Sequence, residues 1–391
     1  MAKRLTPRQE KRSVLPAILI LSAVLLVTVL LDNVLPANTF TLMLIPVLRK
    51  GAIYSLVCVS MNLLNGFTGL FSLGQAGFML LGAYAYGIFS IPADQHPAVY
   101  QYFDGGLVRF SIPELLSGAL GPNLGSFVGA IICIIIAGLV AAVFAALIGI
   151  PVLRLKSDYL AIATLGFAEI MRAVCQWNGL GRITNGSNLL RKYTAFTDIN
   201  LRLGSLNIKL ATFFPFLIAI LSITFIVLLI NSTYGRAFKA IRDDEVAAEA
   251  MGINLAKHKM IAFVTSSFFA GVAGATLAMV LSIAQANNFK SAMTYEILLM
   301  VVLGGIGSIT GSVIGSLLFV AASEWWLRGL DSGKFLGIEA PNIFRNGFRL
   351  VVFSVIIMIV VLFFREGIMG EKELPDLFRK KKKDPAKEAQ S

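Results

Sequence analysis

Long runs of apolar residues alternate with short polar segments along most of this 391-residue chain. A membrane-crossing helix needs about 20 apolar residues to cover roughly 30 Å of hydrocarbon, and many of the runs approach or reach this length. The pattern therefore predicts an all-α fold, a polytopic transmembrane helix bundle of about ten spans. The eighth run is too short for a full crossing, and we expect it to be half of a broken element. The predicted spans are 14–31, 42–64, 75–90, 126–150, 158–175, 211–230, 258–282, 293–304, 309–327 and 347–364.

Glycine and polar residues interrupt the apolar pattern at depth in two places, Asn62–Gln75 and Leu303–Gly311. Irregular backbone is tolerated inside a membrane only where protein or water satisfies its polar groups. Paired glycine-interrupted segments often flank the pathway of a transporter. Close helix packing through small residues is the alternative, and the sequence leaves both open. Packing is favoured for the isolated pairs Gly125-x-x-x-Gly129 and Gly311-x-x-x-Gly315.

A charged, helix-forming segment, Gly235–Asn254, lies between two of the long apolar runs. Because its neighbours belong in lipid, we expect a helix over about 236–252 at the membrane surface. Cap candidates flank it, with Asn231, Ser232 and Thr233 before it and Gly252 and Asn254 after it. Helices that lie on lipid favour Lys and Arg, whereas this one carries an acidic cluster. The segment therefore suits a basic groove on a protein partner.

Composition supports the membrane assignment. Apolar residues make up 57% of the chain, charged residues only 14%, and the mean hydropathy is +0.78. Soluble domains have roughly a quarter charged residues. We predict one transmembrane domain over 14–364, between basic cytoplasmic tails at 1–13 and 365–391. The first run resembles a signal peptide, but it is long and lacks a small-residue cleavage site, so we expect a retained helix.

The net charge of +12 reflects basic residues in tails and loops, not a nucleic-acid surface. With the N-terminus inside, the inner segments hold 20 Lys and Arg residues and the outer segments hold 12. This bias predicts that both termini are cytoplasmic, with the basic tails close to anionic membrane lipid. Trp177, Trp325 and Trp326 all fall at the predicted outer interface, as in an aromatic belt.

The sequence lacks the motifs of an enzyme. Gly69 and Gly74 have the spacing of a phosphate-binding loop, but Gln75 follows where a lysine is needed, so we expect no ATP hydrolysis. His96 and His258 have no metal-ligand pattern around them. We predict no metal and no cofactor. The cysteines are expected to be reduced packing residues, namely Cys58, Cys133 and Cys175.

Glu169 and Arg172 are identified as the only charges deep within an apolar run. Their spacing places them on one helix face, where they can form an intramembrane ion pair. Such a pair is a functional candidate, but nearby Trp177 favours a structural clasp close to the outer interface. An ion-coupled carrier, which needs free acids at mid-depth, is therefore disfavoured. Glu324 and Arg328 are expected to form a structural pair at a helix end.

Several blocks together resemble the second permease subunit of branched-chain amino acid importers of the ATP-binding cassette (ABC) class. They are Leu153–Arg172, Gly235–Gly252, Asn62–Gln75, Leu303–Gly307 and Arg365–Gly367, and the resemblance covers about residues 45 to 370. The resemblance implies an ABC importer permease fold with glycine-broken helices, in a bacterial cell membrane. It also implies four kinds of partner: a second related permease, two cytoplasmic ATPase subunits, an extracytoplasmic substrate-binding protein and membrane lipid.

The resemblance further implies which residues carry function. The ATPase-coupling candidates are Arg236, Asp243, Asp244, Glu245, Glu249 and Gly252. The pathway-lining candidates are Asn62, Asn65, Ser72, Gln75 and Thr164.

The substrate stays open at this point. The usual family pattern is not followed at Ile183–Asn188, Gln75 and Arg365–Gly367. Importers of urea and short-chain amides use similar permeases. A sensory or structural scaffold is disfavoured because the sequence shows no soluble sensory domain.

Overall fold

The computed structural model describes most of the chain. The described residues are 15–33, 39–155, 157–195, 201–203, 206–208, 210–326, 334–335, 338–339, 355, 358, 367–370 and 373–374. Most of the tenth predicted span, Arg328 and most of the two predicted tails lie outside this part; residues 355 and 358 of that span and a few residues of the second tail are described.

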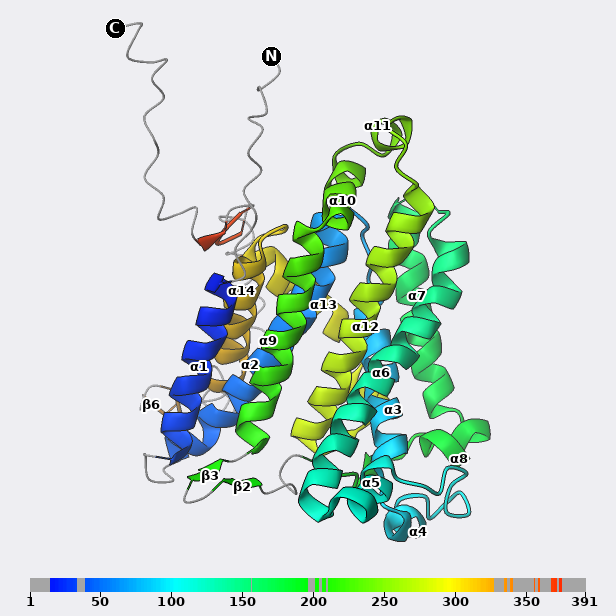
Figure 1. Cartoon of the computed structure of the whole chain (residues 1–391), viewed down its shortest axis with the longest axis vertical. Helices are drawn as coiled ribbons and strands as arrows, with labels where there is room; N and C mark the ends of the chain where they lie inside the picture. The colour runs from blue at the N-terminus through cyan, green and yellow to red at the C-terminus, as the bar shows by residue number, and fades with distance from the viewer. Residues whose placement is uncertain are drawn as a thin grey trace, which may run out of the picture.

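The long helices of the described residues follow the predicted apolar runs, which confirms an all-α bundle (Figure 1). They are α1 Leu15–Asn33, α2 Thr39–Asn62, α3 Gln75–Ser90, α6 Pro122–Val152, α7 Ser157–Gln176, α9 Leu210–Asn231, α12 Leu255–Leu281, α13 Ser291–Gly304 and α14 Ile309–Ala321. Within the described residues, four helices are individually long and apolar enough to cross a membrane, or six if two bent pairs each count as one span. The chain is thus an integral membrane protein. The eighth run forms the short helix α13, which ends at a glycine break as expected.

Shorter elements cover the two ends of the bundle. Two π-helical turns follow long helices, η1 Leu63–Phe67 and η5 Ala322–Trp326. The end opposite α10 and α11 carries η2 Ala93–Gln95, α4 His96–Val99, α5 Ile112–Leu120, η3 Asn178–Leu180, α8 Gly181–Thr184 and η4 Ala286–Asn288. The other end carries α10 Thr233–Asp243 and α11 Glu245–Ala250, which project beyond the long helices (Figure 1).

Three antiparallel strand pairs occur among the described residues, each of two or three residues per strand. They are β1 Leu190–Arg191 with β4 Ile283–Ala284, β2 Leu201–Leu203 with β3 Leu206–Ile208, and β5 Lys334–Phe335 with β6 Ile338–Glu339.

Helix α12 lies at the centre and packs closely on α3. A Cβ atom added at Gly82 of α3 would lie only 2.0 Å from the carbonyl oxygen of Gly271, and one at Gly274 would lie 2.0 Å from that of Met79. No side chain fits in either place, so glycine sets the distance between these two helices.

Both isolated glycine pairs are packing motifs, as predicted. Gly125 and Gly129 bring α6 against the backbone of α5, and Gly311 and Gly315 bring α14 against α13 near Gly304. In each case an added Cβ would lie 2.3 to 2.9 Å from backbone atoms of the neighbouring helix.

Glu169 and Arg172 were expected to be the only charges deep within an apolar run. The described helices hold further charges: Lys50 lies within α2, where its Nζ pairs with the carboxylate of Glu324, and Glu296 lies within α13.

Candidate functional site

The charged segment that the sequence singled out forms two helices instead of one. Ser232 caps α10 by accepting a hydrogen bond from the amide of Tyr234, and Gly252 follows α11 with a left-handed φ of +84°. Both ends therefore match the predicted signals. Between them the backbone becomes extended at Asp244, whose carboxylate accepts from the amides of Val246 and Ala247 at 2.9 and 3.0 Å. Asp244 is thus the N-cap of a second helix. Composition alone does not distinguish a capping aspartate from one that is simply exposed.

The tip of this segment combines apolar and acidic exposure. Val246 and Met251 are 79% and 83% exposed, which is unusual for apolar side chains outside the membrane. Arg236, Asp243 and Glu249 are exposed as well. An apolar centre with charged neighbours is the composition of a protein-docking surface. The sequence drew attention to the acids and missed the exposure of Val246.

Glu245 has a partner within the chain. Its carboxylate accepts from the ammonium group of Lys259 at 2.6 Å, which joins α11 to the first turns of α12. Of the six coupling candidates, Asp244 caps α11, Gly252 ends it and Glu245 braces it. The other three present their side chains at the surface.

Arg242, which the sequence did not single out, lies where α10 meets the first glycine-rich break. Its Nη1 atom donates to the carbonyl oxygen of Gly66 at 3.1 Å, and its Nε and Nη2 atoms donate to Asp243 at 3.3 and 3.2 Å. A Cβ added at Gly69 would lie 3.2 Å from the Cα of Arg242, and one at Gly307 would lie 3.5 Å from Nη1. Arg242 therefore contacts the first break and lies beside the second.

Asn62 joins the two glycine-rich breaks to each other. Its side chain is fully buried, and its Nδ2 donates to the carbonyl oxygen of Ser308 and the hydroxyl of Ser312, both at 2.8 Å. Its Oδ1 accepts from the amide of Gly307 at 2.8 Å. One amide side chain thus satisfies an irregular loop that would otherwise leave polar groups unpaired inside the bundle.

Part of the segment predicted as a basic tail docks on the second break. The carboxylate of Glu373, 4% exposed, accepts from the amides of Ile309 and Thr310 at 2.9 and 3.1 Å and from the hydroxyl of Thr310 at 2.6 Å. The amides of Ile368 and Met369 donate to carbonyl oxygens at the end of α13. Glu373 therefore caps the positive end of α14.

Hydroxyl and amide side chains from other helices hold the first break. Thr164 of α7 accepts from the amide of Leu73 at 3.0 Å, and Thr294 of α13 accepts from that of Ala76 at 3.2 Å. Gln75 donates to Ser266 of α12 at 2.9 Å. Helices α3, α7, α12 and α13 therefore meet at this break.

The five pathway candidates lie together around these breaks. Asn62, Ser72, Gln75 and Thr164 are buried, and half-buried Asn65 accepts from the amide of Ser72 at 3.2 Å. In this conformation they connect helices, and their predicted role as a pathway lining stays a prediction.

Glu169 and Arg172 form the predicted ion pair, with 2.7 Å between Oε2 and Nε. The other carboxylate oxygen of Glu169 accepts from both the amide and the hydroxyl of Ser291, the first residue of α13. Arg172 in turn donates to Gln176, which donates to Asn287 at 2.9 Å. The pair is therefore a clasp between α7 and the start of α13.

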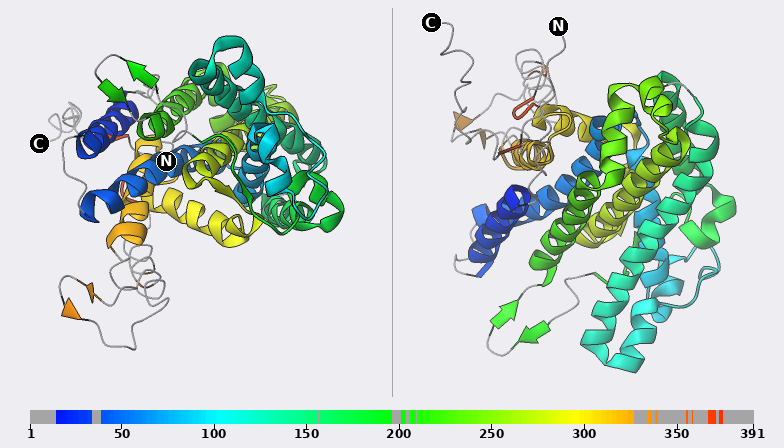
Figure 2. Two further views of the ribbon diagram at one scale, coloured as in Figure 1. Left: turned by 90° about the horizontal axis from the view of Figure 1, so that it is seen from below. Right: turned by 45° about the horizontal axis from the view of Figure 1, so that its top comes forward.

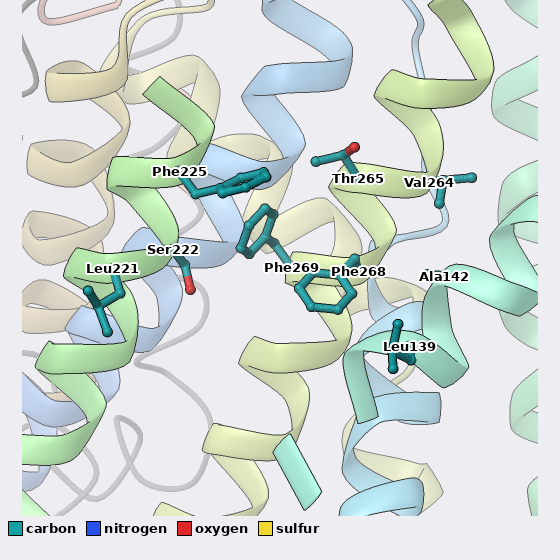
Figure 3. Close-up of a pocket in the computed structure, with 9 residues that line it drawn as sticks. All are labelled: Leu139, Ala142, Leu221, Ser222, Phe225, Val264, Thr265, Phe268 and Phe269. Carbon is teal, nitrogen blue, oxygen red and sulfur yellow. The ribbon is translucent and has the colours of Figure 1, made fainter. Parts of the chain in front are cut away.

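An apolar pocket of about 560 Å³ lies between α6, α9 and α12 (Figure 3). Ser222 and Thr265 are its two polar lining residues, and the rings of Phe225 and Phe269 extend into the gap between α9 and α12 with their centroids 5.5 Å apart. None of the lining residues is charged, so the pocket offers no opposite charge to an amino acid's ammonium or carboxylate group.

The described residues contain no cluster of three or more His, Cys, Asp or Glu side chains that could hold a metal ion. The three cysteines are free and buried.

Comparison with known proteins identifies relatives over most of the chain. A family model described as a branched-chain amino acid transport system permease component matches residues 43–371. The high-affinity branched-chain amino acid transport system permease protein LivM of Escherichia coli K12 is 29% identical over 293 residues, which are 70% of this chain and 61% of that protein. The match thus spans less than two thirds of the length of that relative.

Two archaeal proteins of Methanocaldococcus jannaschii are also similar. The probable branched-chain amino acid transport permease protein LivM is 25% identical over 337 residues, covering 82% of this chain and 92% of that protein. The probable permease protein LivH is 27% identical over 222 residues, covering 54% and 64%. These matches confirm the resemblance that the sequence blocks indicated.

Proposed function

The chain belongs to the family of branched-chain amino acid transport permease components, and from this premise we propose that it is the membrane-spanning permease subunit of an ABC importer. Its substrates are branched-chain amino acids, as the names of its relatives suggest. The chain forms the translocation pathway together with a second, related permease. ATP hydrolysis belongs to partner subunits, since the sequence has no phosphate-binding loop.

The observation that carries this proposal is the projecting α10–α11 tip. Its exposed Val246 and Met251 form an apolar centre, and its acids provide a charged rim for a partner with basic groups. Arg242 joins this tip to the first glycine-rich break by a hydrogen bond and lies beside the second. A movement of the tip would therefore be transmitted to the place where the broken helices meet. Two cytoplasmic ATPase subunits are the partners that this arrangement suits.

The orientation follows from the same tip. With α11 in the cytoplasm, the end that carries α4, α5 and α8 faces outward, where a substrate-binding protein docks and delivers the amino acid. This assignment agrees with the excess of basic residues in the predicted inner segments. We place the chain in a bacterial cell membrane with both termini cytoplasmic.

Reconstitution of the complete transporter in liposomes tests the function. We expect uptake of radiolabelled leucine, isoleucine or valine only when the second permease, the ATPases, the binding protein and ATP are all present. Uptake of urea or a short-chain amide in place of these amino acids would reassign the substrate. Uptake by this chain alone under a proton or sodium gradient would refute the importer role, and this control matters because Glu296 adds an acid within a span.

A further inference from the structure

The exposed side chains of α7 and α13 include apolar Ile162 and Ile170 and a set of charged and polar residues, which we call the polar face. It consists of Glu169, Arg172, Lys290, Tyr295 and Glu296. The side chains of Glu169 and Arg172 are 37% and 24% exposed despite their pairing, and Tyr295 is 49% exposed. Lys290 and Glu296 are exposed as well. The left view of Figure 2 shows α13 (yellow) on the side of the bundle away from α6 (teal).

The polar face lies at the depth of the hydrocarbon. Glu169 is twelve residues beyond Ser157, the first residue of α7, which at 1.5 Å per residue is about 18 Å from the cytoplasmic end of that helix. The hydrocarbon is roughly 30 Å thick, so Glu169 lies within it. Because Ser291 bonds to Glu169, the first residue of α13 lies at the same level.

Two further hydrogen bonds fix the direction of α13. Leu73 bonds to Thr164 of α7, and Ala76, three residues later, bonds to Thr294 of α13. Thr164 precedes Glu169 on α7 and so lies nearer the cytoplasm. Ser291 lies beside Glu169 and Thr294 lies near Thr164, so α13 runs toward the cytoplasm from Ser291 onward. Tyr295 and Glu296 consequently lie about 6 to 8 Å nearer the cytoplasmic end than Ser291, still within the hydrocarbon.

The opposite side of the bundle is different in kind. Its large exposed side chains on α6 and α9 are apolar: Ile135, Leu139, Val143, Leu147, Leu221, Phe225 and Leu228. Such a surface suits acyl chains. A charged side chain on a lipid-exposed helix is costly, and charged residues inside membranes usually face a bundle interior or a water-filled cavity. The polar face is therefore unsuited to lipid.

We propose that the polar face is the surface that this chain turns toward a second permease subunit of the same family, across a water-filled passage. This inference rests on the proposed function, which requires a second permease. Both signs of charge occur on the face, two acids and two bases, so it suits a zwitterion better than an anion or a cation. Lipid, or a second copy of this chain, is the competing occupant.

Cysteine chemistry on the complete reconstituted complex tests the proposal. The three native cysteines are buried and are first replaced by alanine. Tyr295→Cys then reports the polar face, and Val143→Cys, 57% exposed on α6, is the matched control. A permanently charged methanethiosulfonate should react with the Tyr295 variant more than about tenfold faster than with the control, because a thiolate forms in water and not in hydrocarbon.

Cross-linking identifies the occupant. A bifunctional maleimide should join the Tyr295→Cys chain to cysteines placed on the second permease, and the Val143→Cys chain should give no product. Transport with equally slow reaction at both positions would overturn the polar face while leaving the proposed function intact. A cross-link between two copies of this chain would overturn the choice of partner. Cross-linking to the second permease without uptake of any tested solute would support the face and refute the importer role.

Discussion

The guanidinium group of Arg242 donates a hydrogen bond to the carbonyl oxygen of Gly66 at 3.1 Å, which ties α10 to the first glycine-rich break. The two residues are 176 positions apart in the sequence. Gly307 of the second break lies beside the same guanidinium group, and Asn62 bonds the two breaks together. A movement of α10 would therefore act directly on the segments where α2 ends and where α3 and α14 begin.

Arg242→Gln should lower uptake without lowering ATP hydrolysis. A hydrogen bond to a charged group contributes about 1.5–3 kcal/mol, so its loss should lower uptake roughly tenfold or more. The ATPase subunits should still co-purify, because the α11 tip is unchanged. Lys257→Gln, an exposed base near the start of α12 at the same end of the bundle, is the matched control. Equal uptake by both variants at equal ATPase activity would show that the Arg242 contact transmits nothing.

Glu249→Lys should abolish uptake while the permease stays in the membrane. Loss of one exposed ion pair costs only ~0.2–1 kcal/mol, but reversal of the charge also places like charges together across a docking surface. We expect ATPase subunits to be lost on purification. Asp94→Lys, which reverses an exposed acid at the other end of the bundle, is the control and should keep the ATPase subunits on purification. Retention of the ATPases by the Glu249 variant would remove Glu249 from the docking surface.

The long helices could be predicted from sequence because the length and apolar composition of each run are enough to indicate a membrane-crossing helix. The two contacts that organise the site could not. Arg242 bonds to a backbone carbonyl group, which every residue has, so the sequence does not show which residue accepts this bond. Glu373 lies in a stretch whose composition is typical of a solvated tail. Asn62 could be named from the interrupted apolar segment and the family resemblance, but its bonds to Ser308 and Gly307 became visible only in the fold.

Gly82→Ala should destabilise the bundle. The added methyl group would lie 2.0 Å from the carbonyl oxygen of Gly271, so α3 and α12 must separate, and overpacking of this kind costs about 1–3 kcal/mol. Gly166→Ala in α7 is the control, because an added Cβ there meets nothing within 4 Å. That change should be neutral or stabilise by up to ~1 kcal/mol through helix propensity. Thermal unfolding in detergent measures both, and equal melting temperatures would contradict the close packing of α3 on α12.

Acid should loosen the end of the bundle that carries α4, at His96. This side chain is 2% exposed and stacks on Tyr100, with 5.7 Å between ring centroids. Burial lowers the pKa of His96, Arg109 lowers it further, and the backbone at Ile91 and the carboxylate of Glu114 oppose the shift. The neutral ring thus belongs to the folded state. The unfolded chain binds the proton more tightly, so stability is complete above the ordinary histidine pKa of about 6.5 and declines as the pH falls below it.

The measurement is the melting temperature at about pH 7.5 and about pH 5.5, on either side of the ordinary histidine pKa. His96→Phe keeps an aromatic ring against Tyr100 and removes the titrating group. The variant should therefore lose part of the acid-induced decrease that the native chain shows. An unchanged decrease would mean that His96 does not contribute to it.

Single-cysteine labelling should place Ser187 and Ala250 on opposite sides of the membrane. Both residues are exposed. Ala250 ends α11 just before α12 begins, and Ser187 lies close to β1, which pairs with β4 just after α12 ends. The 27 residues of α12 rise about 40 Å, enough to cross the hydrocarbon once. In intact cells an impermeant maleimide should label only Ser187→Cys, and permeabilised cells should show labelling of Ala250→Cys as well. Labelling of Ala250→Cys from outside would place the α10–α11 tip on the wrong side for an ATPase and would refute its coupling role.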